Sequence, residues 1–324
     1  MLGFGSISEA PISALPMEIV LPEPKPLVIL WWNTSLSPLG ESRASSADKA
    51  YVSAYLTEIR RNLNVDIMAL GEVCTEDVND IIAAIGDPHL SFHDATHMVG
   101  RCKFDIAVLF DRRRLSLDDS GSILDSFGKT TLKVGEKLRF ISSESGEYLH
   151  LFVSHWPSRL HCHEFDPKRK EIGTSLRKTL DEIRNATASQ QYIVLMGDYN
   201  DDPCSASLAD HLLATRDREL ARTNDSFLYN PCWRWLGESE PFVHGQTIKS
   251  ICGTHYYSGG ARSRWFTFDQ IMFSSAFLND GPYLLNERKS MIIWSEELES
   301  RLRSPKEIFD HLPVLGVIDI KENV

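Results

Sequence analysis

An acid and an amide follow a buried apolar run near the middle of the chain. The uncharged run 192–196 ends at Gly197, and Asp198 and Asn200 come directly after it. Such a run predicts a buried strand, and residues two apart in an extended segment face the same side. The pair therefore favours a site that holds a cation or a phosphate. For this motif alone, a plain Asx turn is the competing interpretation.

Similar polar residues stand at other predicted strand ends. Those that directly follow apolar runs are Asn33, Glu72 and His155, besides Asp198 and Asn200. Those that stand at or near the start of a run are Asp105, Asp269, Asp310 and His311. Antiparallel neighbours bring strand ends and strand starts to one edge of a sheet, so we expect all these side chains to converge. Oxygen ligands without cysteine favour Mg²⁺ or Mn²⁺ over zinc.

Regular elements must position these residues. The apolar patterns predict strands over 27–32, 65–70, 104–110, 148–153, 266–273 and 314–320, in addition to 192–196. Apolar residues recurring on one face predict helices over 46–63, from Thr75 to about Ile85, and over 168–185, with a short helix through Leu208 and Leu212. The segment 120–140 is typical of a hairpin.

Two groups of histidines have spacings that suit a metal. His89, His93 and His97 recur every four residues, and His161, Cys162 and His163 are clustered. The first group lacks helical apolar periodicity and the second follows Pro157, so a solvated loop competes with a zinc site in each case.

Composition limits the classes of function. The chain has 324 residues, 42% of them hydrophobic, and a net charge of −11 at pH 7. A protein that held nucleic acid by bulk charge would be basic, so such binding needs a local patch. The six cysteines include no C-x-x-C pair, and no long uncharged apolar run predicts a membrane span. We expect free thiols and a cytoplasmic protein.

The ordered motifs resemble the endonuclease/exonuclease/phosphatase superfamily. They are Trp32-Asn33, Gly71-Glu72, Ser154-His155, Gly197-Asp198-Tyr199-Asn200, Phe268-Asp269 and Asp310-His311. The resemblance implies a four-layer α/β sandwich with two mixed sheets face to face and helices outside. We expect one such domain over 27–324, preceded by a flexible lead-in over 1–26.

The resemblance also implies roles for these residues. Glu72 would bind Mg²⁺ or Mn²⁺, with Asn33 and Asp310 as ligands or ligand support, and Asp198 would act on the attacking water. The phosphate would be contacted by Asn200, His155 and His311, and the histidines would be oriented by Asp105 and Asp269. Abasic-site enzymes carry an acid two residues after the first asparagine. This chain has Ser35 there.

A loop-rich segment from Tyr229 to Trp265 interleaves aromatic and basic residues. Its Trp235, Tyr257 and Arg264, together with Arg159, are candidate contacts to a stackable, phosphate-bearing substrate. The competing interpretation is a loop that packs its own aromatics on the sheet. We predict a nuclease acting on DNA. The alternatives are a hydrolase of small or lipid phosphate esters and an inactive binding module.

Overall fold

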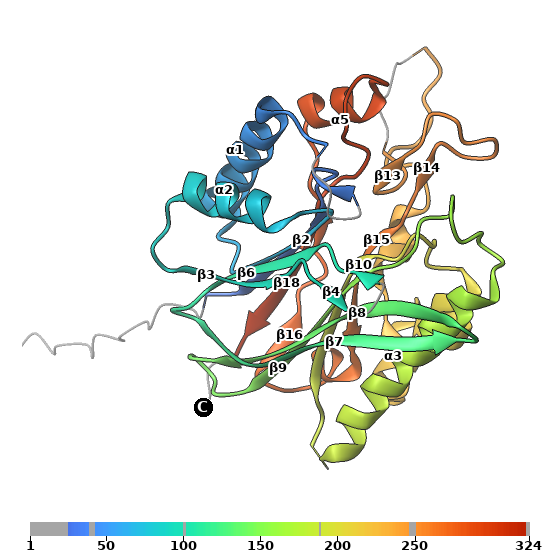
Figure 1. Cartoon of the computed structure of the whole chain (residues 1–324). Coiled ribbons are helices and arrows are strands. Elements are labelled where there is room, and N and C mark those ends of the chain that lie inside the picture. The colour runs from blue at the N-terminus through green and yellow to red at the C-terminus, as the bar shows by residue number, and fades with distance from the viewer. Residues whose placement is uncertain (1–24, 39–42, 100–101, 188, 246–250, 322–324) are drawn as a thin grey trace, which may run out of the picture.

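Two mixed β-sheets lie face to face, with helices on their outer surfaces (Figure 1). The computed structural model describes residues 25–321 except 39–42, 100–101, 188 and 246–250. The predicted lead-in over 1–26 therefore lies almost wholly outside the described residues, as do part of the Tyr229–Trp265 loop and the last three residues of the predicted domain. That one domain spans 27–324 stays a prediction.

The first sheet places two polar strand ends side by side. Its strands run in the order β16 (Tyr283–Leu285), β18 (Val314–Ile320), β1 (Leu27–Asn33), β2 (Ile67–Gly71), β6 (Ile106–Asp111) and β3 (Leu90–Ala95), and β17 (Met291–Ile292) pairs with β18. Because β1 and β2 are parallel and Asn33 pairs with Gly71, Asn33 and Glu72 reach the same edge. Strands β6 and β18 are antiparallel to them, so residues before those strands reach that edge too.

The second sheet repeats this arrangement. Its order is β11 (Ala214–Thr215), β12 (Leu228–Tyr229), β15 (Asp269–Ser274), β10 (Tyr192–Asp198), β9 (Tyr148–His155), β8 (Thr130–Ser142) and β7 (Leu115–Phe127). Asp198 is paired with His155 on parallel β9 and with Asp269 on antiparallel β15. Two short hairpins complete the strands, β4 (Met98–Val99) with β5 (Cys102–Lys103), and β13 (His255–Tyr256) with β14 (Trp265–Phe266).

Helices cover the outer face of each sheet. They are α1 (Ser46–Leu63), α2 (Thr75–Ile85), α3 (Pro167–Ala186), α4 (Arg218–Thr223) and α5 (Glu296–Arg303), with short helical turns η2 (Ser207–His211), η3 (Pro231–Trp235) and η4 (Ser275–Leu278). Figure 1 shows α1 and α2 on the first sheet and α3 on the second. Helix α1 begins at a capping box, in which the Ser45 hydroxyl accepts from the Asp48 backbone and the Asp48 carboxylate accepts from the Ser45 backbone. The predicted four-layer sandwich is confirmed.

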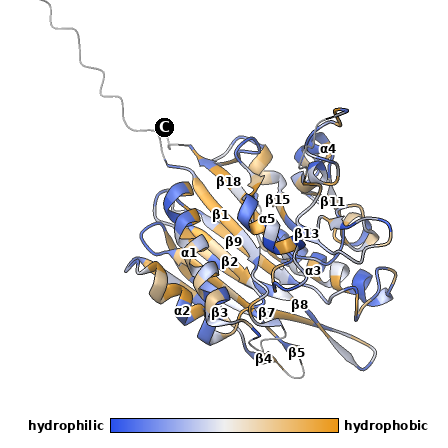
Figure 2. Ribbon diagram, turned by 90° about the horizontal axis from the view of Figure 1, so that it is seen from above, coloured by the Kyte–Doolittle hydropathy of each residue, from blue (hydrophilic) through white to orange (hydrophobic). Residues whose placement is uncertain are grey.

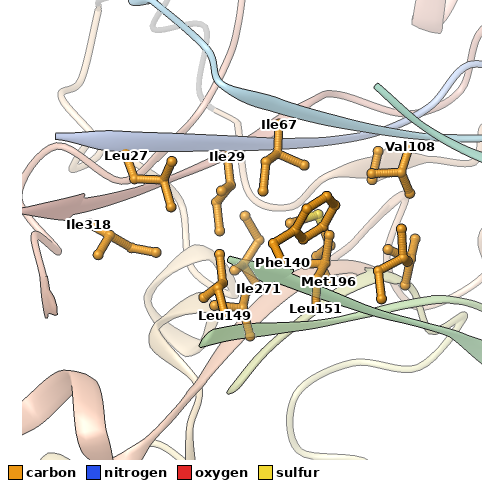
Figure 3. Packing of buried hydrophobic residues seen from close by; sticks show 14 of the residues in the cluster. Leu27, Ile29, Ile67, Val108, Phe140, Leu149, Leu151, Met196, Ile271 and Ile318 are labelled. Atoms are coloured by element: carbon orange, nitrogen blue, oxygen red, sulfur yellow. The ribbon is translucent and has the colours of Figure 1, made fainter. Parts of the chain in front are cut away.

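Alternation along β1 explains both apolar layers. Leu27, Ile29 and Trp31 belong to the cluster between the sheets, whereas Val28, Leu30 and Trp32 pack under the helices of the first sheet. This is the period of two that a strand buried on both faces requires. Figure 3 shows side chains of both sheets meeting in the inner layer, and Figure 2 shows the hydrophobic colour of the central strands.

Some details differ from the sequence predictions. His93 lies within β3 and not in a solvated loop, because the histidine-containing segment pairs with β6. The six cysteines are free, as expected. Within the described part of the chain, no helix has the length and apolar character needed to span a bilayer.

Gly197, which directly precedes Asp198 in the chain, allows β9 and β10 to lie close together at this point. A Cβ atom at Gly197 would lie 2.0 Å from the Ser154 carbonyl oxygen on β9. The backbone of a central strand cannot move away without breaking its ladder. We therefore expect Gly197→Ala to lower the free energy of unfolding by roughly 3 kcal/mol or more, measured by urea denaturation.

Gly237→Ala is the matched control, because a Cβ atom there would meet no heavy atom within 4 Å. Its effect should stay within about 0.5 kcal/mol. Equal stability of the two variants would contradict the close approach at Gly197.

Candidate functional site

The predicted polar residues converge at one edge of the sandwich. Asn33 links the two sheets there, because its Nδ2 donates to Glu72 Oε1 at 3.3 Å and to Asp198 Oδ2 at 3.1 Å. Its own Oδ1 accepts from the Ser35 backbone. Asn33 therefore supports two carboxylates, and its oxygen is already engaged.

The backbone is strained where the strands give way to the site. Ser35, Glu72 and Asn200 have φ values of 58°, 51° and 50°. Left-handed backbone costs a non-glycine residue of order 1–3 kcal/mol and concentrates at functional sites. In Asn200, the backbone N–H donates to Asp198 Oδ1 and the side chain donates to the Trp156 carbonyl. The strained turn thus fixes Asp198 on the side opposite Asn33.

His155 is oriented by a buried carboxylate. Its Nδ1 lies 3.0 Å from Asp105 Oδ2, and Lys133 Nζ donates to the other oxygen of Asp105 at 2.8 Å. Burial disfavours the charged forms of both groups. It is outweighed by their attraction, which raises the pKa of His155 and, with Lys133, lowers the pKa of Asp105. His155 Nε2 then points to Glu72 and Asp198, at 3.9 Å from a carboxylate oxygen of each.

His311 has an equivalent partner in Asp269. Its Nδ1 lies 2.7 Å from Asp269 Oδ2, and the indole N–H of Trp31 donates to Asp269 Oδ1 at 2.7 Å. Burial opposes protonation of His311, but Asp269 and Asp198 outweigh it and raise its pKa well above the ordinary value. His311 Nε2 lies 3.7 Å from Asp198 Oδ2. Two carboxylate–histidine pairs therefore flank Asp198.

Asp310 lies at the exposed side of the site. Its Oδ1 accepts from the Ser35 hydroxyl at 2.7 Å, and its side chain is 42% exposed. His255 Nε2 lies 3.8 Å from Asp310 Oδ2, and the His255 ring stacks on Phe268. Burial, with the nearby His311, lowers the pKa of His255 to about 4. The neutral His255 is a site residue that the sequence analysis did not select.

The four predicted substrate contacts lie in different environments. Arg159 stacks over the Phe268 ring and binds the Asn200 carbonyl and Asp201. Trp235 packs against the core between the sheets, so its ring has the packing role that the competing interpretation gave this loop. Tyr257 and Arg264 are exposed and joined by a backbone hydrogen bond beside the β13–β14 hairpin. The hairpin itself is hydrogen-bonded to Asp310 and Leu312 at the site.

Two groups of side chains in the described residues can hold a metal, and both include His311. They are His255 with Asp310 and His311, and Asp198 with Asp269 and His311. Neither histidine group singled out by spacing is among them. His93 faces Glu136 and His97 stacks on Phe104, so the first group is divided between separate contacts.

Comparison with known proteins identifies a family. The model of the Endonuclease/Exonuclease/phosphatase family matches residues 50–301. A comparison with curated proteins finds no match.

Solved structures show the same fold at low sequence identity. The human Nocturnin catalytic domain with bound sulfate is 14% identical, with a TM-score of 0.59 over 91% of this chain and 95% of that one. D. rerio TDP2 complexed with a single-strand DNA product is 18% identical, with a TM-score of 0.53 over 91% and 99%. The Bacteroides thetaiotaomicron mannosyl-6-phosphatase Bt3783 is 14% identical, with a TM-score of 0.52 over 90% and 98%.

The Asp105–His155 pair should make stability depend on pH. Because folding raises the pKa of His155, its protonation stabilises the fold fully at pH values below the pKa of the unfolded chain. This stabilisation is lost as the pH rises through the pKa of the folded protein. Because folding lowers the pKa of Asp105, its ionised carboxylate stabilises the fold fully at pH values above the pKa of the unfolded chain. This stabilisation is lost as the pH falls through the pKa of the folded protein. Asp105→Asn should therefore cost most, about 3 kcal/mol, between about pH 4 and 6.5, and less on either side.

Urea denaturation across that pH range measures the difference from the unsubstituted protein. Asp280→Asn is the control, because Asp280 is fully exposed and pairs with Lys321 at the surface. A cost of Asp105→Asn that did not change with pH would show that the pair is not ionised in the folded protein.

Proposed function

The chain belongs to the endonuclease/exonuclease/phosphatase family, which makes it a phosphoester hydrolase, and we propose that it is a Mg²⁺- or Mn²⁺-dependent nuclease acting on DNA. One observation carries the proposal. Two carboxylate–histidine pairs and Glu72 surround Asp198 at a single edge of the sandwich. The roles below are part of the proposal.

The environment of Glu72 fits a hard divalent cation. Its side chain is 17% exposed, and His155 at 3.9 Å is its one ion-pair partner among the described residues. Burial raises the pKa of Glu72, and the nearby Asp310 adds to that effect. The buried carboxylate thus lacks a strong positive partner, and Asp310 adds a second carboxylate of the kind that Mg²⁺ and Mn²⁺ prefer. Asn33 supports Glu72 through its amide N–H. A bound cation would neutralise the phosphate and polarise its P–O bonds.

Asp198 is the group proposed to act on water. Asn33 and the Asn200 backbone hold both of its oxygens, so the carboxylate presents a fixed direction to an attacking water. It can accept the proton of that water as the nucleophile reaches phosphorus. Asn200 lies on the same turn and is proposed to contact the phosphate.

The two histidines are proposed to stabilise charge on the phosphate. Asp105 and Asp269 accept from the Nδ1 atoms, which leaves each Nε2 free to face the substrate. The protonated rings can donate to oxygens that gain charge in the transition state. Because the carboxylates fix the ring orientation, this stabilisation needs no rearrangement during the reaction.

DNA as the substrate rests on the hairpin beside the site. Tyr257 is 49% exposed and Arg264 is exposed, next to strands that bond directly to Asp310 and Leu312. An aromatic ring and a guanidinium can stack on a base and bind a phosphate. A protein with this fold forms a complex with a single-strand DNA product, which supports the same substrate class here.

A hydrolase of small or lipid phosphate esters is the second candidate. The guanidinium of Arg159 is already paired with Glu164, Asp201 and Asp202, so the basic group nearest Asn200 is largely neutralised. A short ester needs less basic surface than a polyanion. A phosphatase of a sugar phosphate also shares this fold.

Loss of the Glu72 charge should abolish most of the activity. Glu72→Gln keeps the side-chain shape, and we expect it to reduce the rate by about 10²-fold or more, as chelator should for the unsubstituted protein. The measurement is cleavage of DNA, RNA and a small chromogenic phosphodiester with Mg²⁺ or Mn²⁺. Glu182→Gln, on the exposed face of α3, is the control and should change nothing. Full activity in chelator would refute the metal assignment.

Tyr257 and Arg264 should decide between the two substrate classes. We expect Tyr257→Ala and Arg264→Ala each to weaken oligonucleotide cleavage roughly ten-fold, mainly through KM, because stacking on one aromatic contributes about 1–3 kcal/mol per base. Hydrolysis of a small diester should change little.

Tyr148→Ala and Arg112→Ala are matched controls, since both residues are exposed at the opposite ends of their strands from the site. If the hairpin variants cleaved oligonucleotides like these controls, the small-ester function would be favoured over a nuclease.

A further inference from the structure

His255, Asp310 and His311 differ chemically from the oxygen-rich group around Glu72. Their ligand atoms all lie within 4.8 Å of one another. The Nε2 atoms of both histidines are 3.8 Å from an oxygen of Asp310, one on each oxygen. Two imidazoles and one carboxylate are a ligand set that favours zinc and disfavours Mg²⁺.

The geometry is close to what a zinc ion needs. Ligands about 2 Å from a tetrahedral ion lie about 3.3 Å from one another. Each of the two histidine–Asp310 distances, at 3.8 Å, would have to shorten by about half an ångström. The two imidazoles, whose ligand atoms lie within 4.8 Å of each other, would also have to turn toward a common point beside the Asp310 carboxylate. The Asp310 side chain is 42% exposed, so the ion has a path from solvent.

The surroundings already orient the ligands. Asp269 accepts from His311 Nδ1, and so Nε2 of His311 is directed away from Asp269. A bound zinc ion would displace the proton that this Nε2 otherwise carries. Metal-binding histidines characteristically donate their other ring nitrogen to such a carboxylate. His255 is held by stacking between Phe268 and His311, with ring centroids 5.1 Å and 4.5 Å away. Its buried Nδ1 has no hydrogen-bond partner among the described residues, so no protein acceptor fixes the proton of this ring.

We propose that His255, Asp310 and His311 form an inhibitory Zn²⁺ site. The ion would bind the Nε2 atom of His311, and this histidine could then no longer donate to the substrate phosphate. Zinc binding follows from the geometry alone, whereas inhibition rests on the proposed hydrolase function. His255 is the ligand that distinguishes this site from the oxygen-rich one.

Calorimetric titration of the full chain with ZnCl₂, in a buffer that contains Mg²⁺, tests the binding. We expect one Zn²⁺ per chain. His255→Phe keeps the stacked ring and removes the ligand nitrogen. It should weaken zinc binding by about 100-fold, because loss of a residue that only hydrogen-bonds a metal ligand already costs about 10- to 100-fold in affinity. Glu72→Gln is the matched control, since Glu72 is outside this group, and it should bind zinc within about three-fold of the unsubstituted chain.

Visible absorption of bound Co²⁺ gives an independent readout. Tetrahedral Co²⁺ with nitrogen ligands absorbs strongly, and the band should be absent in His255→Phe and present in Glu72→Gln. If the phenylalanine variant fails to fold, as thermal unfolding would reveal, Asp310→Asn takes its place and should show the same loss. Zinc binding that survives both substitutions, or that Glu72→Gln abolishes, overturns the site.

Activity measurements separate this proposal from the proposed function. If the chain hydrolyses a phosphodiester, Zn²⁺ should inhibit the unsubstituted protein at concentrations about 100-fold below those that inhibit His255→Phe. If no phosphodiester is hydrolysed, the proposed function fails while the zinc titration still decides the site. Hydrolysis by the unsubstituted chain at saturating Zn²⁺ would refute inhibition.

Discussion

The hydrogen bonds of the site run from one sheet to the other, and the spacing of the sheets is therefore the constraint on which the site depends. Asn33 reaches Asp198, Asp105 holds His155, and Asp269 holds His311, with one partner of each pair at the edge of each sheet. Packed sheets lie about 10 Å apart, which is the reach of two polar side chains that meet midway. The apolar inner layer sets this distance, so a change in core packing would also change the distances between the site residues.

Trp31 connects the apolar inner layer directly to a residue of the candidate site. Its indole is fully buried between the sheets, yet its N–H donates to Asp269. Gly71 on the neighbouring strand leaves room for that ring, since a Cβ there would lie 2.6 Å from it. A buried indole N–H needs an acceptor, and a buried carboxylate needs donors, so each satisfies the other. The same pair then keeps Asp269 available to orient His311.

Most of the elements, and the convergence of most of the candidate site residues, could be predicted from the sequence, because these polar residues directly follow or precede uncharged apolar runs. Asn33, Glu72, His155 and Asp198 stand directly after uncharged runs. Trp31 could not be distinguished within such a run, because its acceptor lies 238 residues away. Lys133 falls in a hairpin of mixed polarity and His255 in a loop rich in aromatic residues, where spacing carries no signal. Trp235 shows a different limit, since composition alone does not reveal that this ring packs partly against the core between the sheets.

The proposed substrate contacts and the proposed catalytic residues meet at the β13–β14 hairpin. Its exposed end carries Tyr257 and Arg264, while its buried end contributes His255 to the stack beside His311. The backbone of Thr254 accepts from Leu312, and the Thr254 hydroxyl accepts from the Asp269 backbone. A change in the course of the hairpin would therefore move His311 and Asp269 as well as the contact surface. Because Thr254 joins the buried end of the hairpin to both Leu312 and Asp269, insertions at the exposed end are compatible with the candidate site only when the buried end keeps its register with residues 310–312.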